Sequence, residues 1–315
     1  MKPSEMRTIF MGSPEFALPS LRALVEAGYD VRLAVTQPDR RAGRGGRMRA
    51  PAARIEAERL DIPVFQPDAL RDPEAVAELA RVDPDLIVVA AYGRILPRAV
   101  LDLPRHPVVN VHPSLLPRWR GPSPVAAAIL AGDDTTGVSI MELVPEMDAG
   151  PVLAARPFPI GPSDTTASLE ARLAGEGAEL LIETLPAWLD GDLRPVSQDE
   201  TIVTTCPLLE KAHGHLRGDM TAAEAERAVR AFDPWPGAFV TYNGDRLGIW
   251  SARVGKAGDD LVPGAFTVVA GKPAVAFGEG VLVLEEVQRS GSRRVTGEAF
   301  LNGERGRLAA SAGLA

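Results

Sequence analysis

Short apolar runs alternate with helical patterns over the first two thirds of the chain, and this alternation constrains the fold more than any other feature. Residues 85–91, Asp-Leu-Ile-Val-Val-Ala-Ala, are almost continuously apolar, which is typical of parallel strands buried on both faces. Similar strand patterns occur at 7–11, 31–36, 64–65, 107–112, 137–143 and 152–159, and helical spacing occurs at 15–27, 51–60, 72–80, 124–131 and 166–189. The sequence predicts a doubly wound, Rossmann-like α/β domain over residues 1–205.

The pattern changes in the last third of the chain. Residues 194–219 lose their periodicity and contain prolines and glycines, so we predict a linker at 206–219. A helix at 221–231 precedes five short strands separated by glycine turns, one of them an Asn243-Gly244 hairpin. Closely spaced strands of this kind predict a small, mainly β open barrel, similar to an OB fold, over residues 220–315.

Composition and charge exclude several classes of protein. No apolar run approaches the roughly 20 residues that span a bilayer, and no apolar segment follows the charged start at 1–7. We therefore expect a cytoplasmic protein with no membrane partner. The net charge is -8, and residues 205–315 carry 13 basic and 13 acidic residues. This balance argues against nucleic-acid binding through the whole surface, so any polyanion would meet a local basic patch.

Three polar residues lie close to the ends of predicted strands. Asn110 and His112 belong to the strand at 107–112, and because side chains alternate along a strand, both point to the same face. Asp148 lies in a polar loop after the next strand. An amide, an imidazole and a carboxylate can together stabilise an oxyanion and move a proton. On spacing alone, the alternative that each is a turn former or a hydrogen-bonded core residue stays open.

Other kinds of chemistry have less support in the sequence. The single cysteine, Cys206, precedes a proline and has no recognisable base nearby. No histidine spacing indicates zinc, so we predict no metal. The loop at 12–16 lacks the glycine pattern of a dinucleotide site. Because the sequence shows no plausible serine or cysteine nucleophile, we predict direct group transfer without a covalent enzyme intermediate. The substrate itself would supply the attacking atom.

The central segment at 110–124 reads Asn-Val-His-Pro-Ser-Leu-Leu-Pro-Arg-Trp-Arg-Gly-Pro-Ser-Pro, and Met-Asp-Ala-Gly follows at 147–150. Together they resemble the signature of the folate-dependent formyltransferases. The resemblance spans nearly the whole chain and is strongest to the branch that acts on methionyl-tRNA. Further matching segments are Phe-Met-Gly-Ser-Pro-Glu-Phe at 10–16, Thr-Gln-Pro-Asp-Arg-Arg-Ala-Gly-Arg-Gly at 36–45, Val-Phe-Gln-Pro at 64–67, Ala-Tyr-Gly-Arg-Ile-Leu-Pro at 91–97, Gln-Asp-Glu-Thr at 198–201 and Phe-Asp-Pro-Trp-Pro at 232–236.

The resemblance implies 10-formyltetrahydrofolate as donor and the α-amine of methionine on initiator tRNA as acceptor. The amine would attack the formyl carbon, Asn110 and His112 would stabilise the oxyanion, and Asp148 would orient His112 and help the proton to leave. The resemblance also implies two folate-contacting segments. They are Ser114, Leu115, Leu116 and Pro117, and Arg94, Ile95 and Leu96. The second segment also fits the edge of a helix.

A basic stretch follows the predicted strand at 31–36. It contains Arg40, Arg41, Arg44 and Arg47, and it has no acidic residue up to Arg49. Because it is too rich in glycine for a helix, we predict a loop. Arginines bind backbone phosphate, and the resemblance implies contact with the acceptor stem of tRNA, above all through Arg44. A solvated flexible loop is the alternative.

One segment departs from the family pattern. Thr205 and Leu208 stand where the family usually has a tyrosine and a lysine, and Leu-Arg-Gly at 216–218 replaces a common Ile-Asp-Trp. Lys211 and Arg217 are the candidates for replacing the missing charge. The departure leaves the contacts of this segment with tRNA undefined.

Two alternative functions stay open at this point. The central motif is shared with sister enzymes that formylate amino sugar nucleotides or hydrolyse formyl-folate. A non-catalytic folate- or RNA-binding module is an alternative of another class, but it leaves the combination of Asn110, His112 and Asp148 unexplained. No feature of the sequence indicates an obligate protein partner.

Overall fold

The computed structural model describes residues 2–42, 47–256 and 261–304. Its contacts divide the chain into two compact units. The first unit comprises Met1–Pro124, Thr135–Pro159 and Glu170–Pro207, and the second comprises Val125–Asp134, Ile160–Leu169 and Leu208–Ala315.

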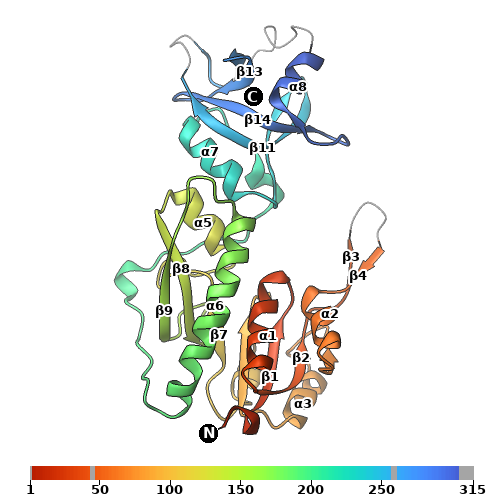
Figure 1. The fold of residues 1–315 in the computed structure, drawn as a ribbon, viewed down its shortest axis with the longest axis vertical. Helices are drawn as coiled ribbons and strands as arrows, with labels where there is room; N and C mark the ends of the chain where they lie inside the picture. Colours follow the sequence, from red (N-terminus) through yellow and green to blue (C-terminus); the bar gives the residue numbers. More distant parts are fainter. Residues whose placement is uncertain (1, 43–46, 257–260, 305–315) are drawn as a thin grey trace. The chain divides into compact units, whose positions relative to one another are not determined.

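A seven-stranded sheet forms the centre of the first unit (Figure 1). The first five strands of its order are parallel, the sixth runs antiparallel to the fifth, and the seventh runs antiparallel to the sixth. The order is β5 (Val64–Phe65), β2 (Asp30–Val35), β1 (Arg7–Gly12), β6 (Leu86–Ala90), β7 (Val109–His112), β8 (Thr135–Glu142) and β9 (Val152–Pro159). This mixed sheet confirms the Rossmann-like α/β prediction, and the strand order reverses between β1 and β6, where such sheets bind ligands.

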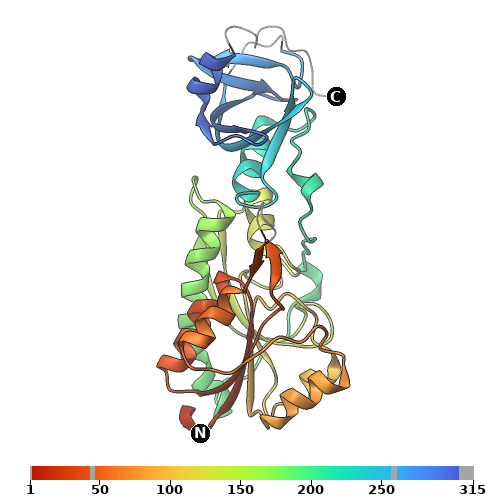
Figure 2. The same ribbon diagram turned by 90° about the vertical axis from the view of Figure 1, so that its right-hand side faces the viewer.

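Helices cover both faces of this sheet. Ile9 and Met11 of β1 share a buried cluster with Leu79 of α3 and Val100 of α4. The helices of the unit are α1 (Leu18–Glu26), α2 (Ala52–Arg59), α3 (Pro73–Arg81), α4 (Arg98–Leu101) and most of α6 (Thr166–Leu189), with short 3-10 turns η1 (Pro3–Glu5), η2 (Glu15–Ala17) and η3 (Glu200–Ile202). Helix α6 runs beside β8 and β9 in both views (Figures 1 and 2).

A buried ion cluster closes the end of the sheet opposite the ligand-binding edge. The Asp85 carboxylate accepts hydrogen bonds from the Arg7 backbone N–H (3.0 Å), Arg7 Nε (2.9 Å) and Arg7 Nη2 (3.0 Å). Arg105 Nε lies 3.1 Å from its Oδ1. Asp85 is 3% exposed, and the hydrogen bonds from Arg7 lower its pKa from 3.8 to about 2. The cluster therefore stabilises the fold without approaching the candidate site.

We expect Asp85→Asn to lower the free energy of unfolding at pH 7 by about 2–3 kcal/mol, because charged hydrogen bonds are lost from a buried site. The folded-state pKa lies below the unfolded value, so this stabilisation is present above about pH 4 and is lost as the pH falls towards 2. Urea unfolding at pH 7 and pH 3 tests this expectation. The gap between wild type and variant should narrow at pH 3, while the exposed control Asp102→Asn should change little at either pH.

The second unit is built on an open antiparallel half-barrel. Its strand order is β10 (Ala238–Tyr242), β11 (Asp245–Gly255), β14 (Val281–Arg289), β13 (Lys272–Ala276) and β12 (Phe266–Val269), with β15 (Val295–Thr296) paired to β14. Asn243 and Gly244 have φ angles of 52° and 80°, which confirms the predicted hairpin turn. The remaining elements are α5 (Pro124–Ala131), η4 (Lys211–Gly214), α7 (Ala222–Ala231) and α8 (Gly297–Gly303).

The predictions missed several short elements. The stretch at 40–49 is not a simple loop, because Arg40 and Arg49 begin and end a two-stranded ribbon of β3 (Arg40–Ala42) and β4 (Arg47–Arg49). Its centre, 43–46, lies outside the described residues. Residues 194–219 lack periodicity but contain η3 and η4. Strand β15 and helix α8 were not predicted, because two residues and a glycine-bounded heptapeptide are too short to show a period.

Candidate active site

Strand β7 presents the two central polar side chains. Asn110 and His112 are 9% and 4% exposed, and they alternate with Val111, which faces the opposite side. A Cβ atom added to Gly177 of α6 would lie 2.7 Å from Val111 Cγ1. Helix α6 therefore approaches β7 closely on the Val111 side and leaves the Asn110 and His112 side for chemistry.

His112 has a partner near each ring nitrogen. Its Nε2 lies 2.9 Å from the Trp119 carbonyl oxygen, and its Nδ1 lies 3.8 Å from Asp148 Oδ1. Because a carbonyl only accepts, Nε2 carries a proton in this ring orientation. Ser114 Oγ donates to the same carbonyl at 3.1 Å. Nδ1 is therefore the nitrogen that can share a proton with the Asp148 side.

Asp148 is held in a turn that crosses back to β8. Its φ is 50°, and its Oδ2 accepts a hydrogen bond of 2.8 Å from the Gly121 N–H. A Cβ on Gly150 would lie 1.9 Å from the Glu142 carbonyl oxygen, so only glycine permits this close return of the loop. The structure thus brings all three predicted catalytic residues to one region.

We call residues 117–123 the central loop. Residues 198–206, which follow α6, pack along this loop and are called the strap. The Arg120 N–H donates to the Thr204 carbonyl at 2.9 Å, and the Cys206 N–H donates to the Arg120 carbonyl at 2.8 Å. Burial raises the pKa of the Cys206 thiol, which makes it a poor nucleophile. The strap is therefore part of the site's framework.

The loop predicted to contact folate is fixed by Ser139 of β8. Ser139 Oγ donates to the Ser114 carbonyl at 2.8 Å and accepts from the Leu116 N–H at 3.1 Å. A Cβ on Gly137 would lie 2.5 Å from Leu115 Cδ2, so Leu115 packs closely on β8. Ser114 is buried, whereas Leu115, Leu116 and Pro117 are partly exposed.

The second predicted folate segment has mixed surroundings. Arg94 Nη1 donates to the Pro67 carbonyl at 3.2 Å and also to the Asp68 carbonyl. Ile95 is 73% exposed, while Leu96 is buried in the core. Helix α4 begins at Arg98, so the helix-edge alternative also accounts for the position of this segment.

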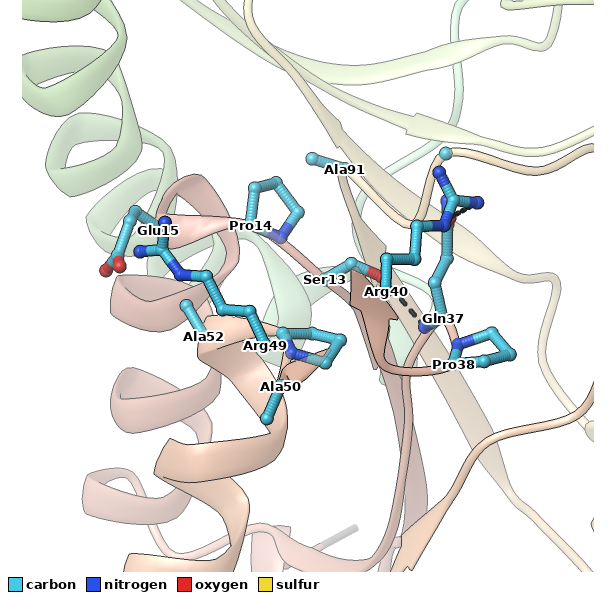
Figure 3. A pocket seen from close by; sticks show the side chains of 12 residues that line it. Ser13, Pro14, Glu15, Gln37, Pro38, Arg40, Arg49, Ala50, Ala52 and Ala91 are labelled. Carbon is cyan, nitrogen blue, oxygen red and sulfur yellow. Dashed lines mark hydrogen bonds between the residues drawn. The ribbon is translucent and has the colours of Figure 1, made fainter. Parts of the chain in front are cut away.

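A pocket of about 510 Å³ lies where the strand order reverses, at the base of the β3–β4 ribbon. Figure 3 shows its proline and alanine walls with the guanidinium groups of Arg40 and Arg49 on opposite sides. The lining residues are Ser13, Pro14, Glu15, Gln37, Pro38, Arg40, Arg49, Ala50, Pro51, Ala52, Ala91 and Gly93. Arg49 was absent from the predicted site residues.

The ribbon starts from an anchored base. The Asp39 carboxylate accepts from Arg54 Nη1 at 2.8 Å, and Gln66 Nε2 donates to the Gln37 carbonyl at 2.8 Å. The Gln37 side chain donates to the Tyr92 carbonyl at 2.8 Å. Among the predicted tRNA contacts, Arg40 and Arg41 are exposed, whereas Arg44 and the Arg47 side chain lie outside the described residues.

Among the described residues, no group of three or more His, Cys, Asp or Glu side chains is placed to hold a metal ion. No helix in that part of the chain is long and apolar enough to cross a membrane.

Comparison with known proteins agrees with this geometry. Residues 6–185 match the family described as formyl transferase, and residues 208–305 match the formyl transferase C-terminal domain. A methionyl-tRNA formyltransferase of Methylococcus capsulatus is 48% identical over 297 residues, covering 94% of this chain and 96% of that protein. A methionyl-tRNA formyltransferase of Myxococcus xanthus is 47% identical over 305 residues, covering 96% of both.

Solved structures with lower identity share the fold. An N-formyltransferase from Helicobacter canadensis superposes with a TM-score of 0.66 at 16% identity, covering 90% of this chain and 99% of that chain. HypX from Aquifex aeolicus gives a TM-score of 0.65 at 21% identity, covering 96% of this chain and 47% of that chain. Because both family descriptions match and the relatives align over nearly their full length, the chain belongs to the formyl transferase family, in its methionyl-tRNA formyltransferase branch.

Proposed function

We propose that the chain transfers the formyl group of 10-formyltetrahydrofolate to the α-amine of initiator methionyl-tRNA. The observation that carries this proposal is the meeting of Asn110, His112 and Asp148 at the end of β7, in a chain whose near full-length relatives are methionyl-tRNA formyltransferases. We place the reaction in the cytoplasm and assign catalysis to residues 1–205, a linker to 206–219, and tRNA assistance to 220–315.

The proposed mechanism is direct attack by the amine. Its nitrogen forms a bond to the formyl carbon while the carbonyl electron pair moves to oxygen. The Asn110 amide donates a hydrogen bond to this oxyanion, and His112, protonated by the proton that the amine loses, adds positive charge beside it. Asp148 opposite Nδ1 stabilises that imidazolium. The oxyanion electron pair then re-forms the carbonyl as the C–N bond to the folate breaks. The electron pair of that bond stays on the folate nitrogen, which receives the proton that the amine gave to the His112 and Asp148 pair.

The folate would lie against the Ser114 to Pro117 loop. This loop offers partly exposed apolar side chains at Leu115, Leu116 and Pro117, and Ser139 fixes its backbone. Ile95 adds an exposed apolar side chain after β6. A rigid, partly apolar wall of this kind suits a flat heteroaromatic donor, since little side-chain freedom is lost on binding.

The tRNA would reach the site along the basic ribbon. Arg40 and Arg49 are direct partners in the β3–β4 register, and the pocket of about 510 Å³ beneath them has proline walls. Guanidinium groups contact phosphate without reading sequence. We therefore propose that this pocket guides the single-stranded 3′ end, and that Arg41, Arg44 and Arg47 of the same basic stretch contact tRNA phosphates.

Labelled 10-formyltetrahydrofolate tests the function directly. The enzyme is offered charged methionyl-tRNA, an amino sugar nucleotide or water alone, and the position of the label is measured. We expect the label on the methionine amine of the tRNA. Label on the sugar or released as formate would replace this proposal with one of the sister activities, and no turnover with any acceptor would contradict catalysis.

Arg49→Ala should raise the KM for methionyl-tRNA about fivefold to tenfold at low salt, because the variant loses one phosphate contact. The slope of log KM against log salt should fall by about one. The KM for the folate should stay within about twofold. Steady-state kinetics at four salt concentrations measure these quantities. The control Arg32→Ala removes an exposed arginine from β2 that pairs with Asp30. Equal salt slopes for both variants would contradict a phosphate contact at Arg49.

A further inference from the structure

We propose that Gln198, supported by Arg120, is a positioning residue that holds Asp148 in its catalytic geometry. The inference rests on the proposed function, because it assigns Gln198 a role through Asp148. The side chain of Gln198 hydrogen-bonds to the Asp148 turn and to Arg120.

The Gln198 side chain joins two parts of the site. Its Nε2 donates to the Asp148 carbonyl at 2.8 Å and to the Gly150 carbonyl at 2.7 Å. Its Oε1 accepts from Arg120 Nε at 3.0 Å. The Gln198 amide therefore donates both of its hydrogen bonds to the Asp148 turn. Because Arg120 can only donate, the amide oxygen must face Arg120, and this fixes the orientation of the amide.

Arg120 is itself held in place. It is 8% exposed, and its Nη2 and Nη1 donate to the two Glu200 carboxylate oxygens at 2.7 and 3.2 Å. A two-pronged arginine–carboxylate pair fixes the plane of the guanidinium. Glu200 lies two residues after Gln198, so both anchors belong to the strap.

The Asp148 turn needs such support. Its φ of 50° lies in the left-handed region, which costs a non-glycine residue about 1–2 kcal/mol. The carboxylate is held by the Gly121 N–H, and the carbonyl of the same residue is held by Gln198. Gly121 follows Arg120 directly. This dipeptide therefore holds the Asp148 side chain through the Gly121 N–H and the Asp148 carbonyl through Arg120 and Gln198. Without Gln198, rotation of this peptide would move Oδ1 away from His112.

Gln198→Met and Gln198→Glu test whether Gln198 positions Asp148 for catalysis or only stabilises the fold. Both variants remove the two donors to the Asp148 turn. Glutamate keeps an acceptor for Arg120 but places a carboxylate oxygen against the Asp148 and Gly150 carbonyls, whereas methionine carries no charge. We expect kcat to fall about 10- to 100-fold in both, with each KM within about threefold and a cooperative thermal transition retained in both. The control Asp102→Asn, which neutralises an exposed carboxylate paired with Arg98, should keep kcat within about threefold.

The decisive measurement is a double-mutant cycle with Asp148→Asn. If Gln198 acts only through Asp148, adding Gln198→Met to Asp148→Asn should lower kcat no further. The proposal would be overturned if the double variant lost kcat by the product of the two single-variant losses. A Gln198 variant that changed only KM, or a wild-type kcat in Gln198→Glu, would overturn it as well. A wild-type protein that formylates no methionyl-tRNA would instead contradict the proposed function, so the two failures are distinguishable.

Discussion

Asp148→Asn is expected to lower kcat about 10²- to 10⁴-fold, the usual range for loss of a positioned acid–base group. Asparagine keeps the size of the side chain and can still accept from the Gly121 N–H, but it carries no charge opposite His112 Nδ1. The imidazolium formed during transfer therefore loses its counter-charge. Single-turnover formylation of methionyl-tRNA measures the loss, and equilibrium folate binding should stay within about twofold.

The control for this variant is Asp102→Asn. Asp102 follows α4, is exposed and forms an ion pair with Arg98. It should turn over like wild type. Turnover of Asp148→Asn within about threefold of wild type would contradict the role of the carboxylate. A large loss of folate affinity with unchanged single-turnover rate would move Asp148 from catalysis to donor binding.

Gly121→Ala is expected to lower kcat by more than about 100-fold and the free energy of unfolding by about 2–4 kcal/mol. Gly121 has a φ of 117°, and a Cβ there would lie 2.3 Å from the Cys206 carbonyl oxygen. Alanine must therefore displace the strap backbone, and the Gly121 N–H that holds Asp148 moves with it. Urea unfolding and single-turnover kinetics together measure both effects.

Gly191→Ala provides the matched control, because Gly191 has a φ of 82° and no atom within 4 Å of an added Cβ. It should cost about 1 kcal/mol from backbone conformation alone and leave kcat unchanged. If Gly121→Ala cost no more stability than Gly191→Ala and also kept normal kcat, the close packing of the strap on the central loop would be disproved.

The sequence predicted the parts of the site whose causes are local. The apolar runs identified the strands because burial on both faces leaves no polar position, and alternation along β7 placed Asn110 and His112 on one face. The Asn243-Gly244 turn was predictable because its two left-handed residues have a strong composition signal. Each of these features depends on neighbours within a few residues.

The missed parts depend on contacts between distant segments. Gln198 stands 50 residues from the carbonyl of Asp148 that it binds, and no periodicity marks it. Its presence in a Gln-Asp-Glu-Thr segment of the resemblance was the only signal. The β3–β4 ribbon was missed because three-residue strands are too short for a pattern. Its base depends on Arg54 of α2 and on Gln66, which directly follows β5.

The strap has a consequence for the order in which the enzyme becomes competent during its own synthesis. The chain leaves the ribosome from its N-terminus, so Asn110, His112 and Asp148 emerge well before residues 198–206. A nascent chain that ends before Gln198 contains all seven strands of the first sheet but lacks the side chain that binds the Asp148 and Gly150 carbonyls. Fragments released before that residue has been added should therefore be inactive in formyl transfer.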